Sequence, residues 1–214
     1  MKGLLRNNIY GTLSNAKVFA GFMTLFGFFG IAVVSQSVQI GYVMIGIIGF
    51  SVSAIIVAKS EFTTKWGKYK LTLPVKRADI VKSQFLNQVI WLLVGTFFAG
   101  VELGLSWLVH GCPFDQHIDV LTLFALGISM SLFMGAIFFP LFYAGGEERG
   151  EVFWMIAILC AFGIDYTIVT ILNSLLEPGI STIVFGAVAL IVCSLAAFGV
   201  SYLLTVSIYS KKEY

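Results

Sequence analysis

Six long apolar runs divide the chain, and they constrain its fold more than any other feature. They occupy residues 18–34, 40–58, 85–109, 120–143, 152–172 and 182–208. A helix that crosses the hydrocarbon core of a bilayer, which is about 30 Å thick, needs about 20 apolar residues, and each run has roughly this length. The sequence therefore predicts an all-α integral membrane protein with six transmembrane helices.

The composition excludes a soluble domain. Hydrophobic residues make up 58 % of the 214 residues and charged residues 11 %, with a mean hydropathy of +0.95, whereas about a quarter of a soluble domain is charged. The connections between the runs are too short for a second domain, so residues 1–214 are expected to form a single transmembrane domain. The first run lacks the cleavage site of a signal peptide and is expected to be a retained helix.

Lys and Arg predict the orientation, because short loops rich in these residues remain in the cytoplasm. All thirteen lie before the first run, between the second and third, between the fourth and fifth, or after the sixth. The other connections, residues 35–39, 110–119 and 173–181, contain none. Both termini are therefore expected to be cytoplasmic, in a multi-pass protein of the plasma membrane.

The first sixteen residues have a separate pattern. Leu5, Ile9 and Leu13 recur every four residues, while Lys2 and Arg6 occupy other faces. This pattern is typical of an amphipathic helix that lies in the headgroup plane. A frayed tail is the alternative.

The connection between the second and third runs contains seven of the thirteen basic residues. A helix that begins at a Ser60 cap would place four apolar side chains on one stripe flanked by lysines, namely Phe62, Trp66, Tyr69 and Leu73. Pro74 then ends the pattern, and "VKRADIVKSQF" predicts a new helix that leads into the third run. One interpretation is that the lysines are attracted to anionic lipid. Attraction to lipid does not require an aromatic stripe, so the presence of the stripe favours a protein partner.

This succession resembles the bacterial type-two ABC exporter permeases. The resemblance implies that the segment is a cytoplasmic coupling helix that contacts an ATP-binding subunit, and that the N-terminal segment is a connecting helix. The residues to which it assigns coupling are Glu61, Phe62, Trp66, Tyr69, Leu73, Pro74 and Arg77. Gln84 departs from the family, which often has Lys there. By size, the chain looks most like exporters of phenol-soluble modulins and other amphipathic peptides.

ATP hydrolysis is expected on another chain. The phosphate-binding string GxxxxGK[ST] does not occur, and around Gly67-Lys68 the required first glycine is Phe62 and the hydroxyl ligand is Tyr69. We therefore expect no enzymatic activity and no cofactor on this chain, with ATP and Mg²⁺ bound by a partner ABC ATPase. Six helices form half of the usual pathway, which implies a second permease copy or a paralogue. The expected cargo is amphipathic or antimicrobial peptides or other hydrophobic molecules.

Two acidic residues lie within the apolar runs. Glu102 and Asp165 precede the outer residues His110 and Asn173 by eight positions, which is about 12 Å of helix. Glu102 lies within a GxxxG string, residues 100–104, which predicts close contact with a neighbouring helix. Both acids are candidates for a translocation path that attracts cationic or amphipathic cargo. Alternatively, both are protonated carboxyl groups that form hydrogen bonds between helices. For Asp165 a further alternative is a wet break, that is, a water-exposed interruption of the helix, if residues 165–179 dip back into the outer leaflet.

Two other classes of function remain open. A proton-coupled carrier or channel would use Glu102 and Asp165. A membrane enzyme or assembly factor has less support, because Glu147-Glu148 would need Arg where Val152 stands to form the EExxxR motif of intramembrane proteases. The cysteines and histidines have no metal-ligand spacing, and no motif indicates nucleic-acid binding.

Overall fold

In the computed structural model of the protein, the described part of the chain forms six helices. They are α1 (Lys2–Ala32), α2 (Gln36–Thr63), α4 (Arg77–His110), α5 (His117–Gly145), α6 (Gly150–Leu175) and α7 (Ile180–Lys211). The structure describes residues 2–32, 35–63, 76–111, 114, 116–146, 149–177 and 179–211, with the backbone alone for residues 61–63. All six helices are long and apolar enough to cross a membrane, and this described part of the chain contains no strand. The predicted all-α, six-span class is confirmed.

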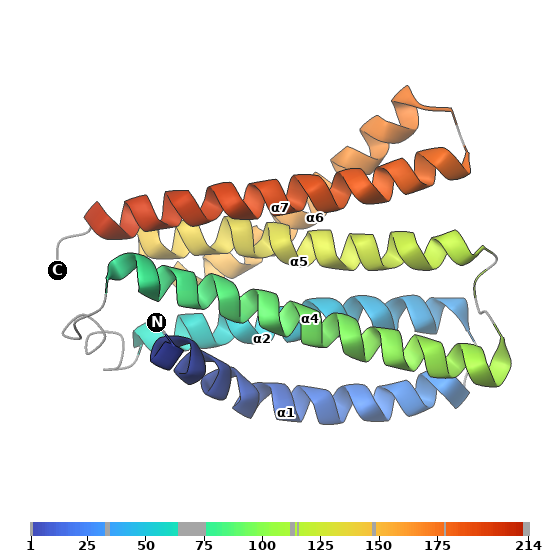
Figure 1. Ribbon diagram of the computed structural model, residues 1–214, viewed down its shortest axis with the longest axis horizontal. Helices are drawn as coiled ribbons and strands as arrows, with labels where there is room; N and C mark the ends of the chain where they lie inside the picture. Colours follow the sequence, from blue (N-terminus) through green and yellow to red (C-terminus); the bar gives the residue numbers. More distant parts are fainter. Residues whose placement is uncertain are drawn as a thin grey trace.

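The helices run side by side, and both chain termini lie at the same end of the bundle (Figure 1). We call this the terminal end and the opposite one the far end. α5 packs most extensively against α7, and α2 against α4, while α1 covers α2 and α4 and α6 packs on α5. The last turns of α6 diverge from the other helices toward the far end (Figure 1).

Two glycines end helices at opposite ends of the bundle. Gly111 follows α4 with φ 84° and donates its N–H to the Trp107 carbonyl, and Gly146 follows α5 with φ 82° and donates to the Phe142 carbonyl. Residues with a Cβ rarely adopt this left-handed conformation, so glycine is the residue that lets these helices stop and the chain turn back.

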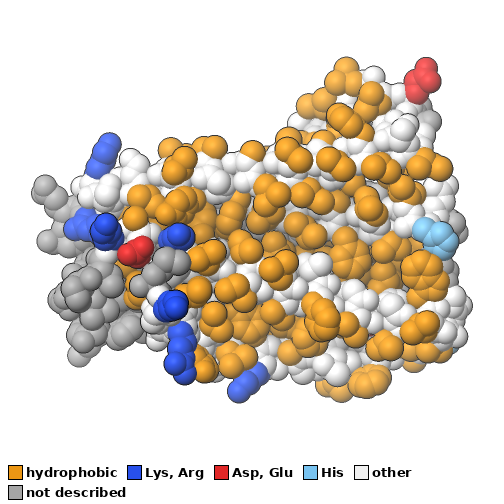
Figure 2. Space-filling model, in the orientation of Figure 1, with side chains coloured by type: hydrophobic (Ala, Val, Ile, Leu, Met, Phe, Trp, Pro, Cys, Tyr) orange, Lys and Arg blue, Asp and Glu red, His pale blue; other side chains and the backbone are white. Residues whose placement is uncertain are grey.

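Aromatic side chains form much of the core. The Phe85 ring of α4 lies 4.5 Å from that of Phe139 on α5 and 4.8 Å from that of Phe198 on α7, measured between ring centroids. By contrast, α1, α6 and α7 leave many large apolar side chains at the surface. Figure 2 shows these side chains over the length of the bundle and the Lys and Arg side chains gathered toward the terminal end. This surface suits a protein surrounded by lipid.

α2 and α4 pack closely against each other at a pair of glycines. A Cβ built on Gly95 would lie 2.7 Å from the carbonyl oxygen of Gly46. Gly100 and Gly104 make no close contact with another helix of the described chain, because a Cβ on either residue would meet nothing within 4 Å. The GxxxG spacing is present, but this face of α4 is turned away from its neighbours.

α1 differs from the prediction at its N-terminal end. Residues 2–16 do not form a separate helix, since one helix runs from Lys2 to Ala32. Its buried residues there are Leu4, Asn8, Thr12 and Ala16, one position away from the predicted apolar stripe. Two hydrogen bonds join them to α4, Asn8 Nδ2 to Ser83 Oγ at 3.0 Å and Asn87 Nδ2 to Thr12 Oγ1 at 2.9 Å. Polar groups that the pattern assigned to water are therefore buried between helices, and a frayed tail is excluded.

Candidate functional site

The connection between α2 and α4 was predicted to couple the protein to an ATPase. Trp66, Tyr69, Leu73 and Pro74 lie outside the described residues, and Glu61 and Phe62 belong to the last turn of α2, where the structure describes the backbone alone. Arg77 is the first residue of α4, so the predicted restart of a helix before the third span is confirmed.

The predicted cap at Ser60 is wrong. α2 continues through this residue to Thr63, and the Ser60 hydroxyl donates to the Val57 carbonyl at 3.0 Å within the same helix. No new helix begins at Ser60, because the second span itself extends into the connection.

Lys59 ties the terminal end of α2 to α6. Its Nζ lies 3.1 Å from Oε1 of Glu151, in the first turn of α6. The Lys59 stem also passes close to the backbone of α6, since a Cβ built on Gly150 would lie 3.2 Å from Lys59 Cε. Glycine at this position therefore allows the lysine to cross over the start of α6.

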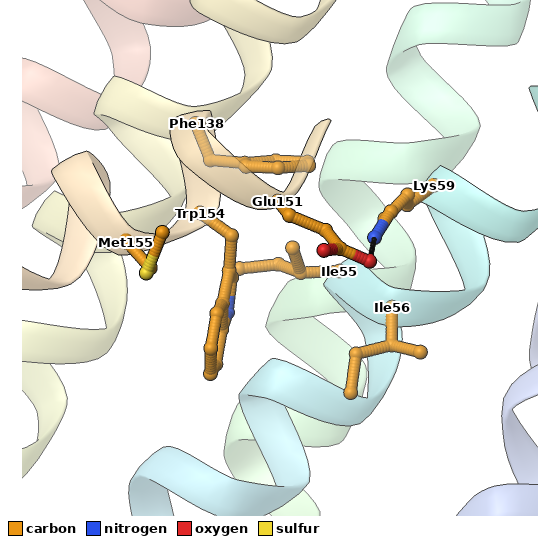
Figure 3. Close-up of a pocket in the computed structure, with 7 residues that line it drawn as sticks. All are labelled: Ile55, Ile56, Lys59, Phe138, Glu151, Trp154 and Met155. Atoms are coloured by element: carbon orange, nitrogen blue, oxygen red, sulfur yellow. Dashed lines mark hydrogen bonds and ion pairs between the residues drawn. The ribbon is translucent and has the colours of Figure 1, made fainter. Parts of the chain in front are cut away.

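A mainly apolar crevice of about 390 Å³ lies beside this ion pair, between α2 and α6. It is lined by Ile55, Ile56, Lys59, Phe138, Glu151, Trp154 and Met155. Figure 3 shows the pair at one side of the crevice, Phe138 of α5 across it, and Trp154 and Met155 on α6. Both α2 and α6 pack on α5, so the crevice separates two helices that share a neighbour.

Arg77 ties the start of α4 to the end of α7. Its Nη1 donates to the carbonyl oxygens of Tyr209, at 3.1 Å, and Ser210, at 3.3 Å, and its guanidinium carbon lies 5.8 Å from the centroid of the Tyr209 ring. The last carbonyls of a helix lack partners within the helix and carry partial negative charge, so a guanidinium binds well there. The two helix ends that flank the connection are thus anchored, α2 to α6 through Lys59 and α4 to α7 through Arg77.

Glu102 lies in the far half of α4, between α1 and α2, with 4 % of its surface exposed. Neither carboxylate oxygen has a hydrogen-bond partner among the residues that the structure describes. The Gln39 amide lies beside the carboxyl but already donates to the Gly30 carbonyl at 3.1 Å and to Ser106 Oγ at 3.0 Å. Glu102 therefore faces neighbouring helices as expected, although not because of Gly100 and Gly104.

Asp165 occupies a different part of the molecule. It is 6 % exposed and faces α5, where Ser129 lies beside its carboxyl. The predicted wet break at Asp165 is wrong, because α6 continues through it to Leu175. Glu102 and Asp165 face different helices and are not brought together. Across the described ranges, no group of three His, Cys, Asp or Glu side chains could hold a metal ion.

A comparison with known protein families matches residues 3–210 to the family described as ABC-2 family transporter protein. The chain belongs to this family. Comparisons with curated proteins and with solved structures gave no significant match. As an ABC-2 family member with six apolar helices, the chain is a transmembrane permease subunit and a multi-pass membrane protein.

Sequence reasoning missed the two anchors of this ABC-2 permease. Lys59 and Glu151 are 92 positions apart, and Arg77 and Tyr209 are 132 apart. No local pattern relates residues at such separations. The sequence did indicate that all four residues lie at the same end of the predicted spans. That information places them at the same depth in the bundle, but it does not show which residue contacts which.

Proposed function

We propose that this ABC-2 family chain is the permease subunit of an ATP-driven exporter that moves amphipathic peptides or other hydrophobic molecules. ATP and Mg²⁺ bind to a separate ABC ATPase, which drives transport. The second half of the transmembrane pathway is another copy of the chain or a paralogue. The terminal end, where the described Lys and Arg residues gather, faces the cytoplasm because positively charged loops remain there.

The anchoring of both helix ends that flank the connection between α2 and α4 supports this proposal most directly. An ATPase that moves this connection would act on α6 through Lys59 and Glu151 and on α7 through Arg77. Two helices with largely exposed apolar surfaces would then shift relative to the rest of the bundle. A docking segment that ended in freely moving helices would transmit no such force.

A proton-coupled carrier has less support from the structure. Such a carrier passes protons along neighbouring ionisable groups within the membrane. Glu102 faces α1 and α2, while Asp165 faces α5, so the two acids do not form a relay.

The test is retention of the ATPase by the purified permease. We expect Trp66→Ala to weaken binding by about 2 kcal/mol or more, as for a central aromatic residue of an interface, which is about thirtyfold in affinity. Lys65→Ala and Lys68→Ala should have small effects that depend on salt, since charges at the rim act mainly on the association rate. Trp107→Ala, at the far end of α4, is the matched control and should bind normally.

The experiment uses detergent without anionic lipid. If Trp66→Ala retained the ATPase and the lysine variants lost it, the connection would be a charged surface segment and not an aromatic docking site. Failure of wild-type permease to bind an ATPase of the P-loop class would overturn the proposed function.

A further inference from the structure

A second crevice, of about 140 Å³, opens between the far halves of α1 and α4. Its mouth is apolar, with Phe28, Val101 and Leu105 all substantially exposed on the surface of the bundle. Glu102 and Tyr42 line its interior, and both are almost completely buried. The crevice therefore leads from the lipid-facing surface to the side chain of Glu102, whose two carboxylate oxygens are themselves buried.

The carboxyl group of Glu102 has no charged partner among the described residues, and the neighbouring Gln39 amide donates its hydrogen bonds to Gly30 and Ser106. Its two oxygens have no hydrogen-bond partner, and no Lys or Arg forms an ion pair with it, within the described part of the chain. An isolated ionised carboxylate in an apolar environment is very unfavourable. Within a membrane, such residues face protein or water and mark binding sites or pathways by default.

Two glycines of α1 make room for this group. A Cβ on Gly30 would lie 2.9 Å from Glu102 Oε1, and a Cβ on Gly27 would lie 3.2 Å from Tyr42 Oη and 3.3 Å from Glu102 Cγ. The glycines are separated by about one turn of helix and face the same side. Any other residue there would press on the carboxyl or on the tyrosine hydroxyl. Of the two glycines, Gly27 also lines the crevice, so the backbone of α1 forms part of its wall.

We infer that this crevice binds the primary ammonium head of an amphipathic molecule that enters sideways from the membrane. The Glu102 carboxylate supplies the opposite charge, and the Tyr42 hydroxyl and ring offer an oxygen acceptor and a cation–π surface. The volume limits the head to a small group, because a water molecule occupies about 30 Å³ of liquid. The apolar tail lies along Phe28, Val101 and Leu105 at the mouth.

This inference deepens the proposed function, on which it rests for its biological role, by naming the class of cargo. Binding itself is independent of any ATPase and is measured on the purified full chain. Loss of ATPase retention would therefore overturn the exporter proposal, whereas loss of amine binding alone would overturn the inference.

The probe is decylamine, with decanol as a neutral molecule of the same chain length, in micelles of uncharged detergent at pH 7. The amine is protonated at this pH, as the lysine side chain is. A ligand that binds the folded protein raises its unfolding temperature, so we expect decylamine to raise it more than decanol does. Glu102→Gln keeps the shape and removes the charge, and it should weaken amine binding by about tenfold or more. Asp165→Asn, which neutralises the other buried acid, should respond as the wild type does.

A second pair of variants leaves Glu102 in place. Val101→Trp adds bulk at the exposed mouth of the crevice and should abolish the difference between the two probes. Leu93→Trp adds the same side chain at an exposed position of α4 outside the crevice and should preserve it. Equal effects of decylamine and decanol on the wild type, or a normal amine response in Glu102→Gln, would overturn the inference. If Glu102→Gln did not fold, the test would be Val101→Trp: a difference between decylamine and decanol as large as in the wild type would overturn the inference.

Discussion

Lys59 and Glu151 form an ion pair across 92 positions of sequence, with 3.1 Å between Nζ and Oε1. The pair joins the terminal ends of α2 and α6 beside a crevice of about 390 Å³ that otherwise separates these helices. Lys59 also lies two positions before Glu61, where the predicted docking segment begins. The pair is therefore placed to transmit movement and contributes little as a source of stability.

The first prediction concerns the energy of this pair. The Lys59 side chain is 29 % exposed and that of Glu151 is 85 % exposed, so water weakens their attraction. A double-mutant cycle of Lys59→Met and Glu151→Gln, followed by thermal unfolding, should give a coupling free energy of less than about 1 kcal/mol. The coupling should fall further in high salt. Lys17→Met, an exposed lysine of α1, is the control, and a coupling of about 3 kcal/mol would show that the pair is shielded from water.

The second prediction concerns Arg77. Arg77→Ala removes the two donors to the Tyr209 and Ser210 carbonyls, so the last turn of α7 should open more often. Amide hydrogen exchange should rise at about residues 205–211, with protection unchanged in the buried middle of the helix around Leu190. Lys82→Ala, at an exposed position one turn further along α4, should leave this exchange unchanged. Unchanged exchange in Arg77→Ala would mean that α7 holds its end without the arginine.

The third prediction concerns orientation. Single cysteines at Ser37, Gln116 and Ser181, all exposed at or near the far end, should react with an impermeant thiol reagent in intact cells. Cysteines at Ser60 and Ser210, exposed at the terminal end, should react only after the cells are opened. The background protein lacks its own three cysteines. Reaction at Ser60 in intact cells would reverse the proposed orientation.

The number of membrane-spanning helices and the apolar part of each could be predicted from sequence, because burial of backbone in a bilayer requires long apolar runs. Which face of each helix is buried could not be predicted. Asn8 and Thr12 lie outside the predicted apolar stripe of the first sixteen residues, yet they are buried because Ser83 and Asn87 of α4 supply their partners. A pattern within one segment contains no information on the polar groups that a distant helix presents to it.

The same limit applies to the candidate sites. Burial of Glu102 followed from its place in an apolar run, and the structure adds Gly30, Gly27 and Tyr42 from two other helices. The ion pair of Lys59 could not be predicted, since Glu151 looks like an ordinary acidic residue in the first turn of a helix. The role of Arg77 in coupling to an ATPase stays a prediction, and its contact with α7 was not foreseen.

The last prediction compares two glycines of α4 that lie in different surroundings, Gly95 and Gly100. Gly95→Ala would place a methyl group 2.7 Å from the Gly46 carbonyl oxygen and 3.1 Å from Ile47 Cα. These atoms belong to the backbone of α2 and cannot move without separating the two helices, so the variant should lose about 1–3 kcal/mol of unfolding free energy.

Gly100→Ala is the matched control. Its new methyl group meets nothing within 4 Å, and alanine favours a helix over glycine by up to about 1 kcal/mol. The two variants should therefore move the unfolding temperature in opposite directions in the same detergent. If Gly100→Ala were the less stable of the two, the contact surface of α4 would be the GxxxG face that the sequence suggested, because the methyl group at position 100 would then be the one that meets a neighbouring helix.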